Sequence, residues 1–243
     1  SGRLRKFYAS RGFWPLWAST GRIGPEADAL LGFLTTAGLD GLKPSSYKVR
    51  DLRAAIENAR AGDPHLVARA ELELSSAFSR YVSDVRRSKK VKMTYSDAKL
   101  KPRKLRADAV LRAAALTQSF SDYVSAMGWM NPHYVRLRKL LAQAGEGGSS
   151  SEALARIRLN LERARLLPGA WTHHVVVDAA TGRLWYYQAG KQQGMMRVVV
   201  GTAQTPTPML AGMLRYAILN PYWNVPADLA QRKIAPKILA GRS

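Results

Sequence analysis

The chain has 243 residues and is 47% hydrophobic, which is enough for one large or two ordinary domains with buried cores. Lys and Arg number 38 against 17 Asp and Glu, a balance that favours a polyanionic neighbour such as nucleic acid, an anionic membrane surface or an acidic polymer. Cysteine is absent, which excludes a disulfide, a thiol nucleophile and a cysteine-ligated metal within this chain.

The first part of the chain has the periodicity of α-helices. Apolar residues recur at helical spacing in 25–38, where Gly38 has the position of a C-cap, and again in 45–61. Asp63 and Pro64 indicate the N-cap and first residue of a longer helix with one apolar face. Three helices are therefore predicted before residue 86.

A basic segment follows, and helical spacing then resumes. Residues 86–106 contain ten basic residues against a single acidic one, Asp97, which predicts a basic loop. Helical spacing returns in 108–127, and Asn131-Pro132 predicts the start of another helix that ends at Ala142. Residues 144–152 are small and polar, as in a flexible connector. A final helix is predicted to end at Pro168-Gly169. Residues three or four apart lie along one side of it: Leu154, Ile157, Leu161 and Arg165.

After Gly169 the pattern changes to that of β-strands. Residues 174–177, 183–188 and 195–201 are separated by short turns and predict a three-stranded antiparallel meander. The prolines of 205–208 interrupt the pattern because proline has no amide hydrogen to donate, and 213–219 predicts a fourth strand. The fold class is α+β, with a helical domain in 1–167 followed by an incomplete antiparallel β-domain in 168–243.

Several blocks of sequence together resemble one known family. NLERARLLP (160–168), VVVGTAQTPTP (198–208) and NPYWNVP (220–226) occur in the order and at spacings similar to those of the large Gram-negative L,D-transpeptidases of the YcbB type. FYASRGFWPLW (7–17) and GLDGLKPSSY (38–47) resemble the start of that family's helical scaffold domain. The resemblance covers nearly the whole chain.

The resemblance implies an enzyme of the periplasm that crosslinks peptidoglycan. In that family a cysteine thiolate, in a Ser-His-Gly-Cys motif, attacks the stem peptide after its third residue, forms a thioester and passes the acyl group to an amine of a neighbouring stem. This chain reaches Ser243 without the motif, so we expect the nucleophile beyond it and no activity from this chain alone. Many members also carry a peptidoglycan-binding module before the NLER helix, where this chain has only residues 144–152.

The segment 220–226 contains the candidate substrate-binding residues. Its two prolines fix φ and hold Tyr222, Trp223 and Asn224 in an extended geometry. The resemblance places this segment in the domain that carries the active-site cleft, so these side chains are predicted to line the substrate channel. The alternative is that Trp223 fills a core, as large aromatic residues commonly do. No catalytic residue is assigned within this chain.

The remaining polar features leave several interpretations open. The histidines, residues 65, 133, 173 and 174, lack ligand spacing and are interpreted as structural or surface residues, and no cofactor or metal is expected. The basic loop is either a solvated face or a surface for anionic lipid headgroups or stem carboxylates; no specific nucleic acid is expected, since no RNP, OB or helix-turn-helix signature is present. A wall-binding or partner-binding scaffold without catalysis is the alternative function.

Overall fold

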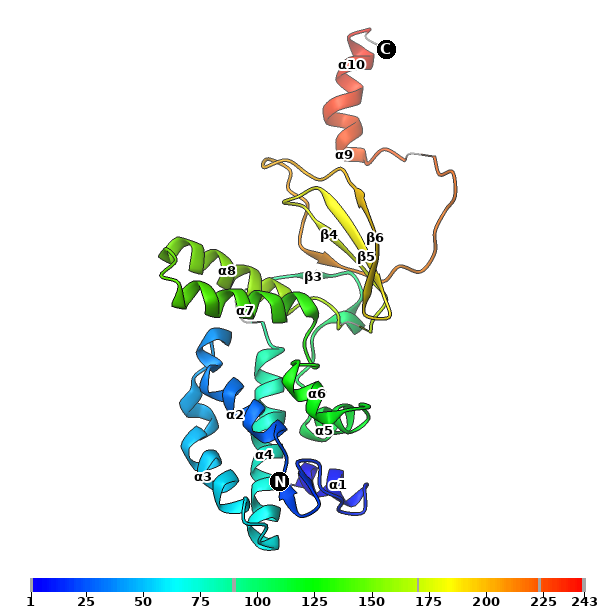
Figure 1. Ribbon diagram of the computed structural model, residues 1–243. Helices are drawn as coiled ribbons and strands as arrows, with labels where there is room; N and C mark the ends of the chain where they lie inside the picture. Colours follow the sequence, from blue (N-terminus) through cyan, green and yellow to red (C-terminus); the bar gives the residue numbers. More distant parts are fainter. Residues whose placement is uncertain (1, 89–90, 170, 223, 242–243) are drawn as a thin grey trace.

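The computed structural model describes residues 2–88, 91–169, 171–222 and 224–241. Figure 1 shows helices in the N-terminal part, a small sheet beyond them, and a C-terminal helical segment that projects away from both. The α+β class predicted from the sequence is confirmed.

Eight helices carry the N-terminal part, and their starts follow the predicted caps. The Oδ1 atom of Asp63 accepts hydrogen bonds from the amides of His65 (2.9 Å) and Leu66 (3.0 Å), and that of Asn131 accepts from the amide of Tyr134 (3.0 Å). The helices are α1 Gly2–Ala9, α2 Glu26–Thr35, α3 Val49–Ala59, α4 Pro64–Val85, α5 Ala107–Ala115, α6 Phe120–Ser125, α7 Pro132–Glu146 and α8 Ser151–Ala164.

Short elements join these helices. The 3₁₀ turns are η1 Ala37–Asp40, η2 Pro44–Tyr47 and η3 Ala98–Leu100, and a two-residue hairpin pairs β1 Ala18–Ser19 with β2 Arg22–Ile23.

Some predicted helix ends were wrong. Gly38 is no C-cap, because α2 ends at Thr35 and η1 continues to Asp40; the left-handed residue is Gly41, with φ at 65°. The predicted helix 108–127 is two helices, and the break falls where Ser119 caps α6 by accepting from the amide of Asp122 (3.1 Å). Helix α7 runs on to Glu146, which leaves a connector of only 147–150.

One apolar cluster unites the helices from α1 to α8. Phe78 lies at its centre and meets Trp17, Phe120 and Trp129 edge-on, with ring centroids 5.4, 6.4 and 5.2 Å away. Leu141 of α7 and Leu161 of α8 belong to the same cluster. The helices on both sides of the connector therefore share one core.

A buried carboxylate attaches the N-terminal block to α4. Glu71 accepts hydrogen bonds from the hydroxyl of Tyr8 (2.7 Å) and from the amides of Leu16 (2.5 Å) and Trp17 (2.9 Å). Burial raises the pKa of Glu71, while these donors act in the opposite direction. The residues that precede α2 are thus fixed by an acceptor that lies more than 50 residues away in sequence.

A second buried carboxylate, Asp40, connects η1, α4 and α7. It accepts from the hydroxyls of Tyr81 (2.8 Å) and Tyr134 (2.6 Å) and from Nε of Arg138 (2.9 Å). Its side chain is fully buried, so the charge depends on these partners for compensation. Asp40 is therefore the polar centre of the helical part.

The C-terminal end of α8 is fixed to the same centre. Arg165 donates from Nη1 to the carbonyl of Val85 (2.6 Å) and from Nη2 to the carbonyl of Asp40 (2.5 Å). The side-chain amide of Asn131 donates to the carbonyl of Ala164 (2.7 Å). The last turn of the NLERARLLP helix is therefore held by groups from three other parts of the domain.

The sheet is the predicted meander. Strands β4 His174–Asp178, β5 Arg183–Gln188 and β6 Lys191–Arg197 pair antiparallel in the order β4-β5-β6. Trp185 lies opposite Val176 on one side and Met195 on the other. The third strand begins at Lys191 and not at Met195, and a register irregularity follows Tyr186.

The predicted fourth strand, 213–219, was wrong. Pairing is confined to β7, Leu210–Ala211, which lies parallel to β3, Thr94–Tyr95, and is not part of the meander. A segment with alternating apolar residues forms a strand only where a neighbouring strand offers a free edge for hydrogen bonding and other residues pack against its apolar face. In this structure Leu214 and Leu219 are 80% and 88% exposed. The chain then forms α9 Ala227–Leu229, the π-helical turn η4 Ala230–Ile234 and α10 Ala235–Leu239.

The sheet is poorly covered by other elements. Val175 and Val177 on β4 are 40% and 49% exposed, and Met195 and Met196 on β6 are more than half exposed. None of the described residues after Arg165 is fully buried. The helical segment 227–239 projects beyond the sheet in Figure 1.

Candidate functional site

The predicted substrate-binding segment lies in an extended stretch that follows the sheet. Tyr222 is 94% exposed and Asn224 is also exposed, whereas Trp223 lies outside the described residues. Asn220 has a positive φ of 49°, so the chain turns immediately before Pro221. The structure leaves both side chains in solvent, and their role in a substrate channel stays a prediction.

The TAQTPTP run forms a tight turn stabilised by threonine hydroxyls. The amide of Gly201 donates to Oγ1 of Thr207 (2.8 Å), and the amide of Thr205 donates to Oγ1 of Thr202 (3.3 Å). A Cβ on Gly201 would lie 2.0 Å from the carbonyl oxygen of Thr205. Glycine is therefore required at this position of the turn.

The basic segment pairs with a later part of the chain through strands β3 and β7, and we call this parallel pair the clamp. The amides of Thr94 and Ser96 donate to the carbonyls of Met209 (2.9 Å) and Ala211 (3.0 Å). A Cβ on Gly212 would lie 2.6 Å from the hydroxyl oxygen of Ser96, so a larger residue here would require this hydroxyl to move. The predicted basic loop is thus partly a strand that pairs across the two regions.

An ion pair extends the clamp and uses the one acidic group of the basic segment. Nη2 of Arg215 lies 2.9 Å from Oδ2 of Asp97, and the amide of Lys99 donates to Oδ1 of Asp97 (2.9 Å). The hydrogen bond from the amide of Lys99, followed by that from Arg215, lowers the pKa of the Asp97 carboxyl. The carboxylate of Asp97 is therefore engaged within the clamp.

A groove of about 540 Å³ lies beside this clamp. We call it the junction groove, because its lining combines the basic segment with a residue that follows α8: Arg87, Ser88, Val91, Lys92, Met93, Tyr95, Pro102 and Leu166. Arg87 and Lys92 are exposed, whereas Val91, Met93, Tyr95 and Leu166 are half-buried. The groove therefore has apolar walls and cationic side chains.

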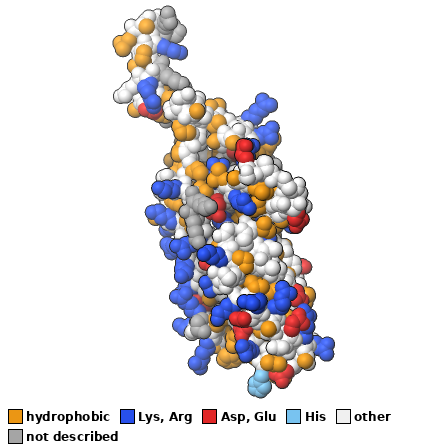
Figure 2. Space-filling model, turned by 90° about the vertical axis from the view of Figure 1, so that its left-hand side faces the viewer, with side chains coloured by type: hydrophobic (Ala, Val, Ile, Leu, Met, Phe, Trp, Pro, Cys, Tyr) orange, Lys and Arg blue, Asp and Glu red, His pale blue; other side chains and the backbone are white. Residues whose placement is uncertain are grey.

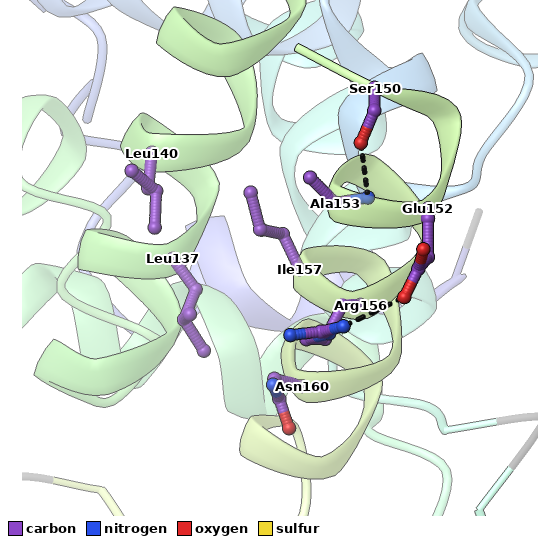
Figure 3. Close-up of a pocket in the computed structure, with 8 residues that line it drawn as sticks. All are labelled: Leu137, Leu140, Ser150, Glu152, Ala153, Arg156, Ile157 and Asn160. Atoms are coloured by element: carbon purple, nitrogen blue, oxygen red, sulfur yellow. Dashed lines mark hydrogen bonds and ion pairs between the residues drawn. The ribbon is translucent and has the colours of Figure 1, made fainter.

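A second groove, of about 360 Å³, opens between α7 and α8 next to the connector. Figure 3 shows Leu137 and Leu140 of α7 facing Ile157 of α8 across it. Polar groups lie along α8, where Ser150 caps the helix through the amide of Ala153 (3.2 Å) and Arg156 pairs with Glu152 (2.8 Å). Each of these paired polar side chains has its partner within α8 or its N-cap, so these pairs stabilise the helix and do not bridge the groove.

Two histidines meet one tyrosine where α7 approaches the sheet. The ring of His174 stacks on Tyr187 with centroids 4.8 Å apart, and His133 meets the same tyrosine edge-on at 5.5 Å. Burial, assisted by the charge of Arg136 and by His174, lowers the pKa of His133. Within the described residues no group of three or more His, Asp or Glu side chains could hold a metal ion.

Lys and Arg are the commoner charged side chains, 38 against 17 Asp and Glu. Figure 2 shows Lys and Arg gathered along one edge of the helical part, while Asp and Glu are scattered. All described Lys and Arg residues of 86–106 are exposed. No helix among the described residues is long and apolar enough to span a membrane.

Comparison with known proteins matches a family model to each of the two regions. Residues 2–141 match the family model of the Scaffold domain, and residues 172–242 match that of the L,D-transpeptidase catalytic domain. The chain belongs to the scaffold-bearing L,D-transpeptidases. It is 25% identical over 239 residues to a protein of Haemophilus influenzae named Putative L,D-transpeptidase. That alignment covers 98% of this chain and 47% of the relative, so the chain spans about half the relative's length.

The sequence indicated only some of the residues that join the two regions of this chain. Arg165 was predicted on the apolar side of the last helix; in the structure it is buried directly after α8, and its carbonyl partners were not predicted. The β3–β7 clamp and the junction groove were missed altogether. The interleaving of Met93, Tyr95 and Pro102 among the cations was the one available signal, because such residues can form a wall as well as a solvated loop.

Proposed function

We propose that the whole protein is a peptidoglycan L,D-transpeptidase of the periplasm. In this proposal residues 1–167 are its scaffold domain and residues 168–243 the first part of its catalytic domain. The observation that carries the proposal is the order of the two family matches along one chain, scaffold first and catalytic domain second. The name of the Haemophilus influenzae relative supports it.

The proposed reaction is acyl transfer between stem peptides. A cysteine thiolate attacks the carbonyl carbon of the third residue of a tetrapeptide stem, the peptide bond to the fourth residue breaks, and the fourth residue takes up a proton and leaves as a free amine while a thioester forms. An amine of a neighbouring stem then attacks the thioester, loses its proton and releases the thiolate. None of these 243 residues is a cysteine, so the chain supplies positioning and not the nucleophile. Tyr222, Trp223 and Asn224 are proposed to line the channel for the stem.

The proposed partners are the stem peptides of peptidoglycan, in the setting of cell-wall crosslinking and cell-shape maintenance. The sequence also indicated an anionic membrane surface as a partner of residues 86–106. The exposure of the described cations in this segment supports attraction to an anionic partner. No specific nucleic acid partner is proposed.

A non-catalytic scaffold is the second candidate for this chain. Its helical part has an extended apolar core and two buried carboxylates, Glu71 and Asp40, whose hydrogen-bond partners all lie in the helical part. Such a body could hold a partner or the wall without chemistry. The two candidates differ in whether the gene product forms an acyl-enzyme.

Mass spectrometry of the intact protein after exposure to a carbapenem tests the proposed function. The product of the whole gene is expected to gain one stoichiometric adduct, whereas the 243-residue chain is expected to gain none because it contains no cysteine. An adduct on the 243-residue chain would overturn the assignment of a cysteine nucleophile. A gene product that stays unmodified and does not crosslink tetrapeptide stems would favour the non-catalytic scaffold.

A further inference from the structure

The junction groove has two free cations at its walls. Arg87 and Lys92 form no ion pair with a carboxylate among the described residues. The acidic residue of the same segment, Asp97, is already bound by Arg215 and by the amide of Lys99, and Arg106 pairs with Asp108 at 3.1 Å. The positive potential at Arg87 and Lys92 is therefore not cancelled from within the segment.

The groove also contains a hydroxyl without a partner. The oxygen of Ser88 is buried and has no hydrogen-bond partner among the described residues. A buried polar atom of this kind costs free energy unless a ligand or water satisfies it. Ser88 lines the groove together with Arg87 and Lys92, so the lining holds a hydroxyl as well as two cations.

Part of the lining of the groove is held in place by contacts elsewhere in the fold. The segment that contains Met93 and Tyr95 is fixed by the clamp between β3 and β7, and Leu166 is fixed because Arg165 anchors the end of α8. A concave groove of about 540 Å³ can enclose a short stretch of chain, whereas a flat bilayer surface would reach only its rim. Shape therefore favours a chain segment over a membrane.

We propose that the junction groove binds an acidic peptide segment, which pairs its carboxylates with Arg87 and Lys92 and lays its apolar atoms against Val91 and Tyr95. Guanidinium groups hold carboxylates through two parallel hydrogen bonds, which suits Arg87 to this ligand. The inference goes beyond the proposed function, since it assigns a docking site outside the catalytic domain and does not depend on the transfer reaction. A peptide bound here contacts the end of the scaffold and the strand that pairs with the β-domain.

Fluorescence anisotropy with a labelled eight-residue peptide of alternating Glu and Ala tests the proposal on the 243-residue chain. The double variant Arg87→Ala/Lys92→Ala is expected to bind this peptide about tenfold or more weakly, because two charge-assisted contacts are removed. Arg3→Ala/Arg5→Ala is the matched control: it removes the same charge from exposed positions on α1 and is expected to bind within about twofold of the unmodified chain.

A third variant separates shape from charge. Val91→Trp keeps every cation and fills the groove, so it is also expected to weaken binding of the peptide. Equal losses of affinity in both double variants would overturn the proposal, because they would show an effect of net charge alone. Equal binding of a peptide of alternating Gln and Ala would also overturn it, because the groove would then not recognise carboxylates. Binding to phosphatidylglycerol vesicles that depends on Arg87 and Lys92, with a peptide affinity that does not, would overturn it in favour of a membrane surface.

Discussion

The helical part and the β-domain of this chain are stabilised in different ways. Every fully buried side chain among the described residues lies between Leu4 and Arg165. The sheet formed by β4, β5 and β6 has a backbone ladder with one irregularity, after Tyr186, but only half-buried and exposed side chains. Side-chain burial therefore stabilises the first region, whereas hydrogen bonds between strands define the second.

This difference predicts where a substitution lowers the stability of the fold most. In the helical part a buried group such as Asp40 has three partners from two helices, so its loss affects distant elements together. In the sheet a side chain such as Val175 is 40% in solvent and loses less when it is truncated. The contrast can be tested one side chain at a time.

The largest effect is expected from Asp40→Ala. The substitution leaves the guanidinium of Arg138 and the hydroxyls of Tyr81 and Tyr134 without their acceptor in the core, and should lower the free energy of unfolding by about 3–5 kcal/mol. Urea unfolding followed by far-ultraviolet circular dichroism measures this. Asp28→Ala is the control, because Asp28 pairs with Arg60 at a half-exposed site where about 1 kcal/mol or less is at stake. Equal losses would contradict the central role of Asp40.

A smaller effect is expected from a core cavity, compared with the same kind of truncation in the sheet. Leu74→Ala on α4 removes a side chain with no exposure and should lower the free energy of unfolding by about 2–5 kcal/mol. Val175→Ala on β4 should cost about 1 kcal/mol or less in the same urea experiment. If the Val175 variant were as unstable as the Leu74 variant, the proposed difference between the two regions would be wrong.

The smallest effect concerns the contact between the two regions. The pKa of His133 is lowered in the folded protein, so the stability that this group contributes is present above the ordinary histidine value of about 6.5 and is lost as pH falls through the lowered pKa. The ring contact with Tyr187 should therefore loosen under acid conditions.

Nuclear magnetic resonance titration measures this pH dependence through the ring protons of His133 and Tyr187. His133→Phe keeps an aromatic ring against Tyr187 but cannot be protonated, so the Tyr187 signals should lose the His133-dependent part of their pH response. A pKa of His133 at or above about 6.5 would show that burial does not govern this group.

The sequence by itself determined the local structure. Asp63 and Asn131 predicted helix starts that the structure confirms, because a cap uses donors only two or three residues away. The turns of the meander were equally local, and so was the apolar side of α8. The absence of cysteine fixed from composition alone that no thiolate can come from these residues.

Tertiary structure decided what depends on distant partners. Residues 213–219 have the sequence pattern of a strand but do not form one. An alternating pattern determines which face of a strand is apolar, but pairing also requires the edge of a neighbouring strand. Conversely Thr94 and Tyr95 became a strand through Leu210 and Ala211, more than a hundred residues later. The carbonyl partners of Arg165 and the junction groove arise in the same way, since both need backbone positions that only the packed helices fix.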